Sequence, residues 1–247
     1  VVPQIQQLIS DGSVKAKQMA IQLLGQIRLP DAETVLDTTF QMLNQGKIPP
    51  AVTLDLLEAA EQQSGANRLT GLISEFRERQ KQVGTKAALW SECLEGGDAE
   101  RGRTVFFGRA AASCRRCHLV NGEGAAVGPD LSAIAKDKDR NYLLEAIVDP
   151  NAKIAKGFET TNILDFDGKV HSGIIREESE TVVKLVTPKG AVVTIPVAEI
   201  EDRAPGLSGM PADITKGLTR QDVRDLVEYL STLKVARKAA EHGKGDE

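Results

Sequence analysis

Apolar residues recur at intervals of three and four positions through residues 1–83, which is the spacing of a buried helix face. Turn-forming segments interrupt this pattern at residues 11–13, 29–31, 46–50 and 64–65. The sequence therefore predicts five short amphipathic helices joined by tight turns, and such turns favour antiparallel stacking as in an α-solenoid. No residue-level signature recurs at a fixed period, so an ordinary helical bundle stays open as the alternative.

Between residues 158 and 203 the pattern changes to the alternation that is typical of β-strands. Runs at 160–166 and 170–175 flank Asp167-Gly168, a dipeptide typical of hairpin turns, and runs at 181–187 and 191–195 predict a second strand pair. A last helix is expected from about Thr219 to Arg237, with Thr219 and Asp222 as a variant of the capping box. Its predicted buried stripe consists of Val223, Leu226, Val227, Leu230 and Leu233.

Composition excludes several classes of protein without indicating an activity. Apolar residues make up 41% and charged residues 27%, and no long uncharged stretch occurs, which argues against a membrane-spanning or a wholly disordered chain. The net charge of −4 disfavours nucleic acid as a partner, and the aromatic content of 4% disfavours a base-stacking platform. The chain begins at Val1 without a leader, so we expect a mature protein or a fragment whose signal peptide is absent.

The segment Cys114-Arg115-Arg116-Cys117-His118 is the strongest chemical signal in the sequence. The pattern C-x-x-C-H predicts attachment of a c-type haem. Two thiols separated by two residues can each add to one vinyl group of the porphyrin, and the histidine that follows can bind the iron. The sequence therefore predicts one covalently attached haem c, with Cys114, Cys117 and His118 as its binding residues and His118 as a ligand of the metal.

Two other uses of paired cysteines fit less well. A thioredoxin-like redox pair needs a βαβ setting, which the pattern around this motif does not predict. A structural zinc site needs four ligands, normally with a second cysteine pair, and only Cys93, His171 and His242 remain. We expect Cys93 to be buried and inert near Trp90, with a role in dimer formation as the alternative.

The second axial ligand is predicted from the three methionines. Met19 and Met42 lie in the helical N-terminal segment, where methionine usually fills the core. Met210 instead lies in Leu207-Ser208-Gly209-Met210-Pro211, a loop bounded by glycine and proline just before the last helix. We therefore favour Met210 as the distal iron ligand. His171 is the alternative, although a solvent-facing histidine on a strand is the interpretation that we favour for it.

Together these residues resemble the Planctomycete/Verrucomicrobium-type (PVC-type) haem-binding cytochrome c domain, a class I c-type haem fold. The resemblance covers residues 96–235, and the helical segment ahead of it resembles HEAT-like repeats. It is carried by residues 97–102, 105–106, 114–118, 122–124, 127–131, 142–150, 158–160, 168–170, 172–173, 210–211 and 225–230.

The resemblance implies two further features of the site. Gly102 and Phe106 on the first helix of the domain would cross Leu226 and Tyr229 on its last helix. The loop Gly128-Pro129 would present the Pro129 carbonyl to the Nδ1–H of His118 and so fix the imidazole ring. The resemblance also implies that the β unit is an insertion shared by the family, which leaves its role open.

We therefore expect a mostly α chain in which a small antiparallel β insertion interrupts a class I cytochrome c fold. The predicted parts are a HEAT-like domain (1–83), the first part of the cytochrome c domain (84–157), the insertion (158–203), the distal loop with the last helix (204–236) and a charged tail (237–247).

The implied function is electron transfer in the bacterial periplasm, without an enzymatic activity of its own. The implied partners are a fused or associated dehydrogenase as donor and a cytochrome or oxidase as acceptor, and neither nucleic acid nor a membrane span is expected. A haem enzyme or gas-sensing domain with an open distal site is one alternative function. A HEAT-like scaffold that binds other proteins is another.

Overall fold

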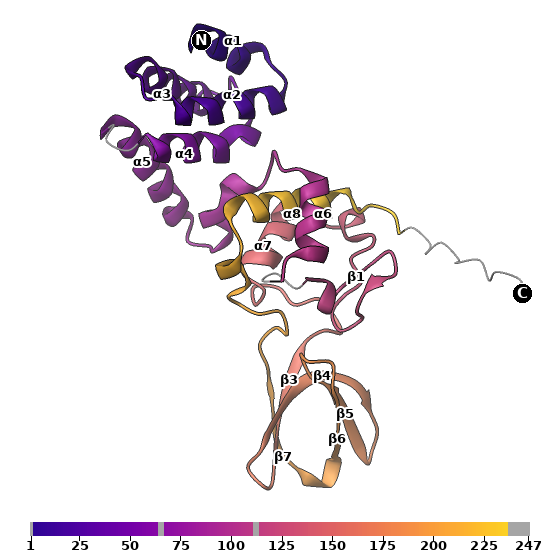
Figure 1. Ribbon diagram of the computed structural model, residues 1–247. Coiled ribbons are helices and arrows are strands. Elements are labelled where there is room, and N and C mark those ends of the chain that lie inside the picture. The colour runs from indigo at the N-terminus through magenta and orange to yellow at the C-terminus, as the bar shows by residue number, and fades with distance from the viewer. Residues whose placement is uncertain (1, 64–66, 111–113, 237–247) are drawn as a thin grey trace, which may run out of the picture. The chain divides into compact units, whose positions relative to one another are not determined.

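The computed structural model describes residues 2–63, 67–110 and 114–236 (Figure 1). The chain divides into two compact units, one formed by residues 1–103 and 218–229 and the other by residues 104–217 and 230–247. Helices α6 (Ala99–Gly108) and α8 (Arg220–Thr232) each contribute to both units. In the part of the chain that the structure describes, no helix is both long enough and apolar enough to span a bilayer. The predicted boundaries at residues 83, 157 and 203 stay predictions.

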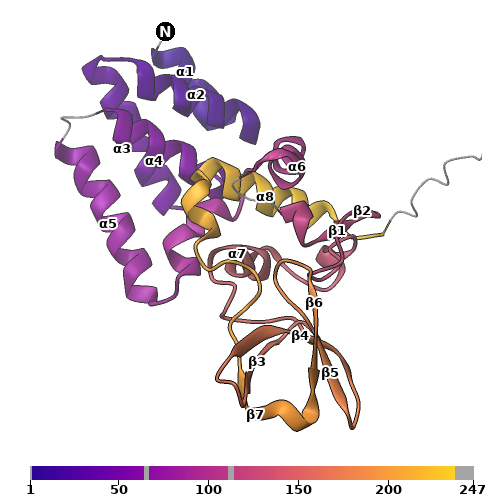
Figure 2. The ribbon, with the colours of Figure 1, turned by 60° about the horizontal axis from the view of Figure 1, so that its bottom comes forward.

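The first unit contains the five helices that the N-terminal pattern predicts (Figure 2). They are α1 (Val2–Asp11), α2 (Val14–Gln26), α3 (Pro30–Asn44), α4 (Thr53–Gln62) and α5 (Asn67–Val83), with short 3₁₀ helices at η1 (Pro50–Val52) and η2 (Ala87–Cys93). Helix α2 packs against both α1 and α4. Their shared core includes Ile9, Ile21, Leu24, Leu36 and Leu57, none of which is more than 1% exposed. Burial of this apolar face stabilises the array.

The expectation that Met19 fills the core is wrong. Its side chain is 62% exposed, because α2 turns Ala20, Ile21 and Leu24 inward instead. Met42 is partly buried and packs against the N-terminal core, as predicted.

The second unit contains a five-stranded antiparallel sheet. Its strands are β3 (Thr160–Asp165), β4 (Val170–Glu178), β5 (Val182–Val186), β6 (Val192–Pro196) and β7 (Ile200–Pro205), in the order β6-β5-β4-β3-β7. The two edge strands β6 and β7 are consecutive in the chain and are joined by the 3₁₀ helix η5 (Val197–Glu199). The sheet is curled, as Figures 1 and 2 show, and its two edge strands meet at one end through η5. Ile163, Val183, Leu185 and Ile195 form its core.

The predicted strand pairs and the turn at Asp167-Gly168 are confirmed, and Gly168 has a φ of +75° as a hairpin turn requires. Strand β7 is missing from the prediction. All its residues after Ile200 are exposed, so no apolar alternation marks this edge strand in the sequence.

The rest of the second unit consists of short elements. They are η3 (Cys114–Arg116), β1 (Leu119–Val120), β2 (Glu123–Gly124), η4 (Ile134–Lys136), α7 (Arg140–Val148) and η6 (Ile214–Gly217).

The capping box of α8 is present as predicted. The amide of Thr219 donates to Asp222 Oδ2 at 2.8 Å, and the amide of Asp222 donates to Thr219 Oγ1 at 3.1 Å. All five residues of the predicted stripe are buried. The predicted end at Arg237 is wrong, because α8 ends at Thr232 and residues 233–236 are not helical. Arg237, the charged tail and His242 lie outside the described residues.

Helices α6 and α8 cross at Gly102, the glycine that the resemblance assigns to this crossing. A Cβ atom at Gly102 would overlap the carbonyl oxygen of Asp225 and would lie 2.7 Å from Tyr229 Cβ. Phe106 and Leu226 are both buried. Only glycine allows the two backbones to approach so closely.

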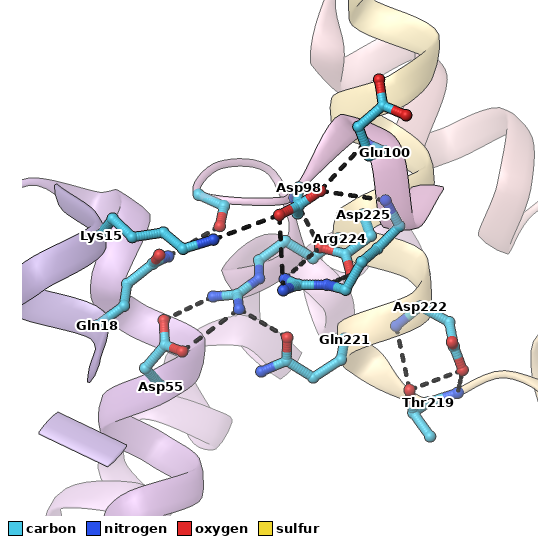
Figure 3. A network of polar contacts seen from close by, with 12 residues as sticks. Lys15, Gln18, Asp55, Asp98, Glu100, Thr219, Gln221, Asp222, Arg224 and Asp225 are labelled. Carbon is cyan, nitrogen blue, oxygen red and sulfur yellow. Dashed lines mark hydrogen bonds and ion pairs between the residues drawn. The ribbon is translucent and has the colours of Figure 1, made fainter. Parts of the chain in front are cut away.

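A polar network ties α8 to earlier elements of the first unit (Figure 3). Arg224 Nη1 lies 2.6 Å from Asp55 Oδ2 on α4, and both side chains are at most 2% exposed. Asp225 accepts a hydrogen bond from the amide of Asp98 at 2.7 Å. It also forms an ion pair with Arg101, whose Nε lies 2.8 Å from Asp225 Oδ2. The polar face of α8 is therefore occupied by contacts within the unit.

Candidate haem-binding site

The predicted attachment motif forms a single tight turn. Cys114 opens the 3₁₀ helix η3, and its carbonyl oxygen accepts hydrogen bonds from the amides of Cys117 at 3.1 Å and His118 at 2.9 Å. Cys114, Cys117 and His118 are each partly buried. The turn thus brings together two thiols and an imidazole, the donor set that the sequence predicts.

The loop at residues 127–129 is bonded to the same turn. The amides of Val127 and Gly128 donate to the Cys117 carbonyl oxygen at 3.1 and 2.7 Å. His118 Nδ1 lies 2.8 Å from the carbonyl oxygen of Pro129, the contact that the resemblance implies. A Cβ atom at Gly128 would lie 2.9 Å from His118 Cε1, so the backbone of this loop lies directly against the ring.

These contacts set the protonation of the His118 ring. A carbonyl oxygen can only accept, so Nδ1 carries the proton and donates it to Pro129. Burial lowers the pKa of His118, although the hydrogen bond to Pro129 acts in the opposite direction. The neutral ring then carries its lone pair on Nε2, the atom with which histidine binds a metal in this tautomer.

The two cysteines do not have the properties of a reactive thiol pair. Burial raises the pKa of Cys114 to about 11 and also raises the pKa of Cys117. Redox-active thiols in C-x-x-C motifs have lowered pKa values instead. Across residues 2–63, 67–110 and 114–236, no group of three or more His, Cys, Asp or Glu side chains could hold a metal ion. The two thiols and the His118 imidazole, which lies against Gly128, therefore fit haem c better than a disulfide or a zinc site.

Residues 99–184 match the family model of cytochrome c. The match begins at the first residue of α6, contains the whole attachment motif and ends within β5. None of the curated proteins matches the chain. The cytochrome c domain implies a covalently bound haem c and, in general, redox partners and electron transfer.

A small hairpin supports the attachment motif of the cytochrome c domain, and the sequence interpretation missed it. Strands β1 and β2 pair through a turn at Asn121 and Gly122, which have φ values of +53° and +85°. Gly124, with a φ of +112°, lies so close to the motif that a Cβ atom would overlap the carbonyl oxygen of His118. The Asn-Gly dipeptide is the signal that could have predicted this hairpin.

The loop that carries Met210 is tied to the rest of the second unit by hydrogen bonds. The amide of Ser208 donates to Asn151 Oδ1 at 2.8 Å, and the Leu207 carbonyl oxygen accepts a hydrogen bond from Thr160 Oγ1. The amide of Met210 donates to Ser208 Oγ at 3.2 Å. Met210 is partly buried, and its role as the distal ligand stays a prediction.

The expectation that His171 faces solvent is wrong. Its side chain is 13% exposed, and Nε2 lies 2.7 Å from Asp165 Oδ2 on the neighbouring strand. The hydrogen bond to His171 is the largest cause of the lowered pKa of Asp165. This contact gives the histidine a structural partner in the sheet.

Cys93 is buried as predicted, with no exposed surface. Burial raises the pKa of its thiol to about 12, and Sγ lies 3.4 Å from the carbonyl oxygen of Arg220. The guanidinium of Arg220 lies 4.3 Å from the centre of the neighbouring Trp90 ring. This environment is that of an inert structural thiol.

Proposed function

We propose that the chain is an electron-transfer module of the PVC type, with one haem c bound between His118 and Met210. The observation that carries this proposal is the His118 ring, which donates through Nδ1 to Pro129 and lies against Gly128 within the attachment turn. Such a hydrogen bond fixes the orientation of a ligating imidazole and makes it a stronger donor.

The residues of the site have separate tasks. Cys114 and Cys117 would hold the porphyrin by thioether bonds, and His118 and Met210 would bind the iron. When bound, haem c supplies an iron that exchanges one electron between its ferrous and ferric states. With both of these residues bound, the iron would have no open position for a substrate or gas, so we propose electron transfer rather than catalysis or sensing.

We also propose redox partners and a cellular location for the protein. Haem c and the PVC-type resemblance support a periplasmic module that accepts electrons from a fused or associated dehydrogenase and passes them to a cytochrome or oxidase. We also propose that helices α1 to α5 form HEAT-like repeats, because short helices joined by tight turns are typical of such repeats.

The attachment is tested by replacing both motif cysteines in a haem c-maturing expression host. Cys114→Ala combined with Cys117→Ala should yield a protein without covalent haem, measured as the loss of the haem mass from the denatured chain. Cys93→Ala is the matched control, because this buried thiol has no part in the motif, and it should keep the haem mass. Covalent haem on the double variant would refute the assignment.

A further inference from the structure

The five-stranded sheet carries a β-bulge at a position that faces the haem-binding motif. Strands β4 and β5 pair in regular register through Ile175 and Leu185, and the register then shifts before Glu177 pairs with Lys184. Arg176 is the extra residue at this shift and has no pairing partner of its own on β5. Bulges commonly redirect a side chain and recur beside functional sites.

The redirected side chain reaches the loop that holds His118. Arg176 Nη2 donates a long hydrogen bond of 3.4 Å to the carbonyl oxygen of Val127. The same guanidinium lies 5.1 Å from the centre of the Phe158 ring, just before β3, in a cation–π contact. The ring thus restrains the arginine on the side of the loop.

A second element of the sheet approaches the same residue. The turn between β5 and β6 contains Gly190, whose Cβ position would lie 3.7 Å from Val127 Cγ2. The turn therefore lies near Val127, independently of the arginine. Val127 accepts a hydrogen bond from the bulge residue and lies close to a turn of the sheet.

Val127 is linked to the imidazole by backbone alone. Its amide and that of Gly128 both donate to the Cys117 carbonyl oxygen, and the next residue, Pro129, accepts the proton of His118 Nδ1. We infer that the sheet braces this loop and that Arg176 is a positioning residue for the His118 imidazole. This inference rests on the proposed function only in assigning His118 to the iron.

Amide hydrogen exchange of the holoprotein tests the brace directly. Arg176→Gln removes the charge and the fork of donors, so the amides of Val127 and Gly128 should exchange about 3- to 10-fold faster. The electron paramagnetic resonance spectrum of the ferric protein should shift as well, because its anisotropy depends on the orientation of the axial imidazole.

Arg203→Gln is the matched control. Arg203 lies on β7 of the same sheet and pairs with Glu178 at 2.6 Å, so its replacement removes an arginine but leaves Val127 untouched. Arg203→Gln should change neither the exchange rates of the two amides nor the electron paramagnetic resonance spectrum. Phe158→Leu keeps the Arg176 charge but removes the ring below it, and should accelerate the same two amides to a smaller extent.

The outcomes separate the brace from the proposed function. Arg176→Gln with unchanged exchange and an unchanged spectrum would overturn the inference, as would equal acceleration in Arg203→Gln. A chain that binds no haem would refute the proposed function instead, and the exchange measurement on that chain would still test the contact between Arg176 and the loop.

Discussion

At the scale of single residues, the haem-binding site is defined by what lies against the His118 ring. The carbonyl oxygen of Pro129 fixes the protonated nitrogen, and the absence of a side chain at Gly128 allows the loop to approach the ring. The family resemblance predicts the contact of Pro129 with the ring, whereas the close approach of Gly128 comes from the structure. The sequence could not predict Arg176, because nothing in the strand pattern marks a bulge.

The same scale gives a prediction for the distal position. If Met210 binds the iron, Met210→Ala should open the sixth coordination site, and the ferrous variant should then bind carbon monoxide rapidly. Wild-type protein should bind it slowly or not at all. Stopped-flow mixing followed in the Soret region measures both rates. Rapid binding by the wild-type protein would contradict Met210 ligation and favour a gas-binding haem protein.

Asp98 gives a prediction for the dependence of stability on pH. Its pKa lies below the ordinary value of 3.8, chiefly because the amide of Arg101 donates to its carboxylate, with a smaller contribution from Lys15. The unfolded chain therefore takes up a proton at higher pH than the folded chain does. The stabilisation is complete above about pH 5 and is lost as the pH falls through the folded-state pKa.

Asp98→Asn removes this charge and keeps a residue that can cap α6. It should reduce the free energy of unfolding at pH 7 by about 0.3–1 kcal/mol, and the difference from wild type should shrink as the pH falls through the folded-state pKa toward about pH 2. Urea unfolding of both proteins at a series of pH values measures it. A difference that stays constant down to that pH would rule out the carboxylate as its source.

At the scale of elements, the crossing of α6 and α8 depends on one glycine. Gly102→Ala would place a methyl group on the Asp225 carbonyl oxygen, so the helices must move apart. We expect a loss of about 1–3 kcal/mol in the free energy of unfolding, as for other overpacked sites.

Gly71→Ala is the matched control for this crossing. Gly71 lies within α5 and has no atom close to its Cβ position, so alanine there should stabilise the helix by about 0.5–1 kcal/mol. Thermal unfolding of the two variants measures the change in stability that each substitution causes. Equal effects of the two substitutions would show that close approach is not what requires glycine at position 102.

Elements were predictable wherever burial leaves a periodic signal. Helices α1 to α5 and strands β3 to β6 all bury apolar residues, and their pattern appears in the sequence. Strand β7 is exposed along nearly its whole length, and β1 and β2 are two residues each, so periodicity could not reveal them. The last helix was predicted too long, because its apolar stripe continues to Leu233 after the helix has ended at Thr232.

At the scale of the whole molecule, the first compact unit joins residues far apart in the sequence. Asp55 and Arg224 form a buried ion pair across 169 positions, and Gln221 Oε1 accepts a further hydrogen bond from the same guanidinium at 2.7 Å. Charged residues are usually expected at the surface, so the sequence pattern does not predict the burial of these two. The buried ion pair therefore connects α4 to the first turns of α8.

The free energy of unfolding should depend strongly on both members of this ion pair. Asp55→Ala should leave Arg224 buried without its counter-charge and destabilise the protein by about 3–5 kcal/mol. Asp55→Leu combined with Arg224→Met should be less destabilised than the sum of the two single changes. Urea unfolding of the four proteins gives the coupling free energy. Additive effects would show that the two side chains do not interact in solution.

The central claim is a haem c held by His118 and Met210 in an electron-transfer module. Its most direct test is the visible and near-infrared absorption spectrum of the oxidised protein. We predict a low-spin spectrum with the weak near-infrared band that methionine ligation produces, and the loss of that band in Met210→Ala. A high-spin spectrum, or a low-spin spectrum without the band, would contradict the claim.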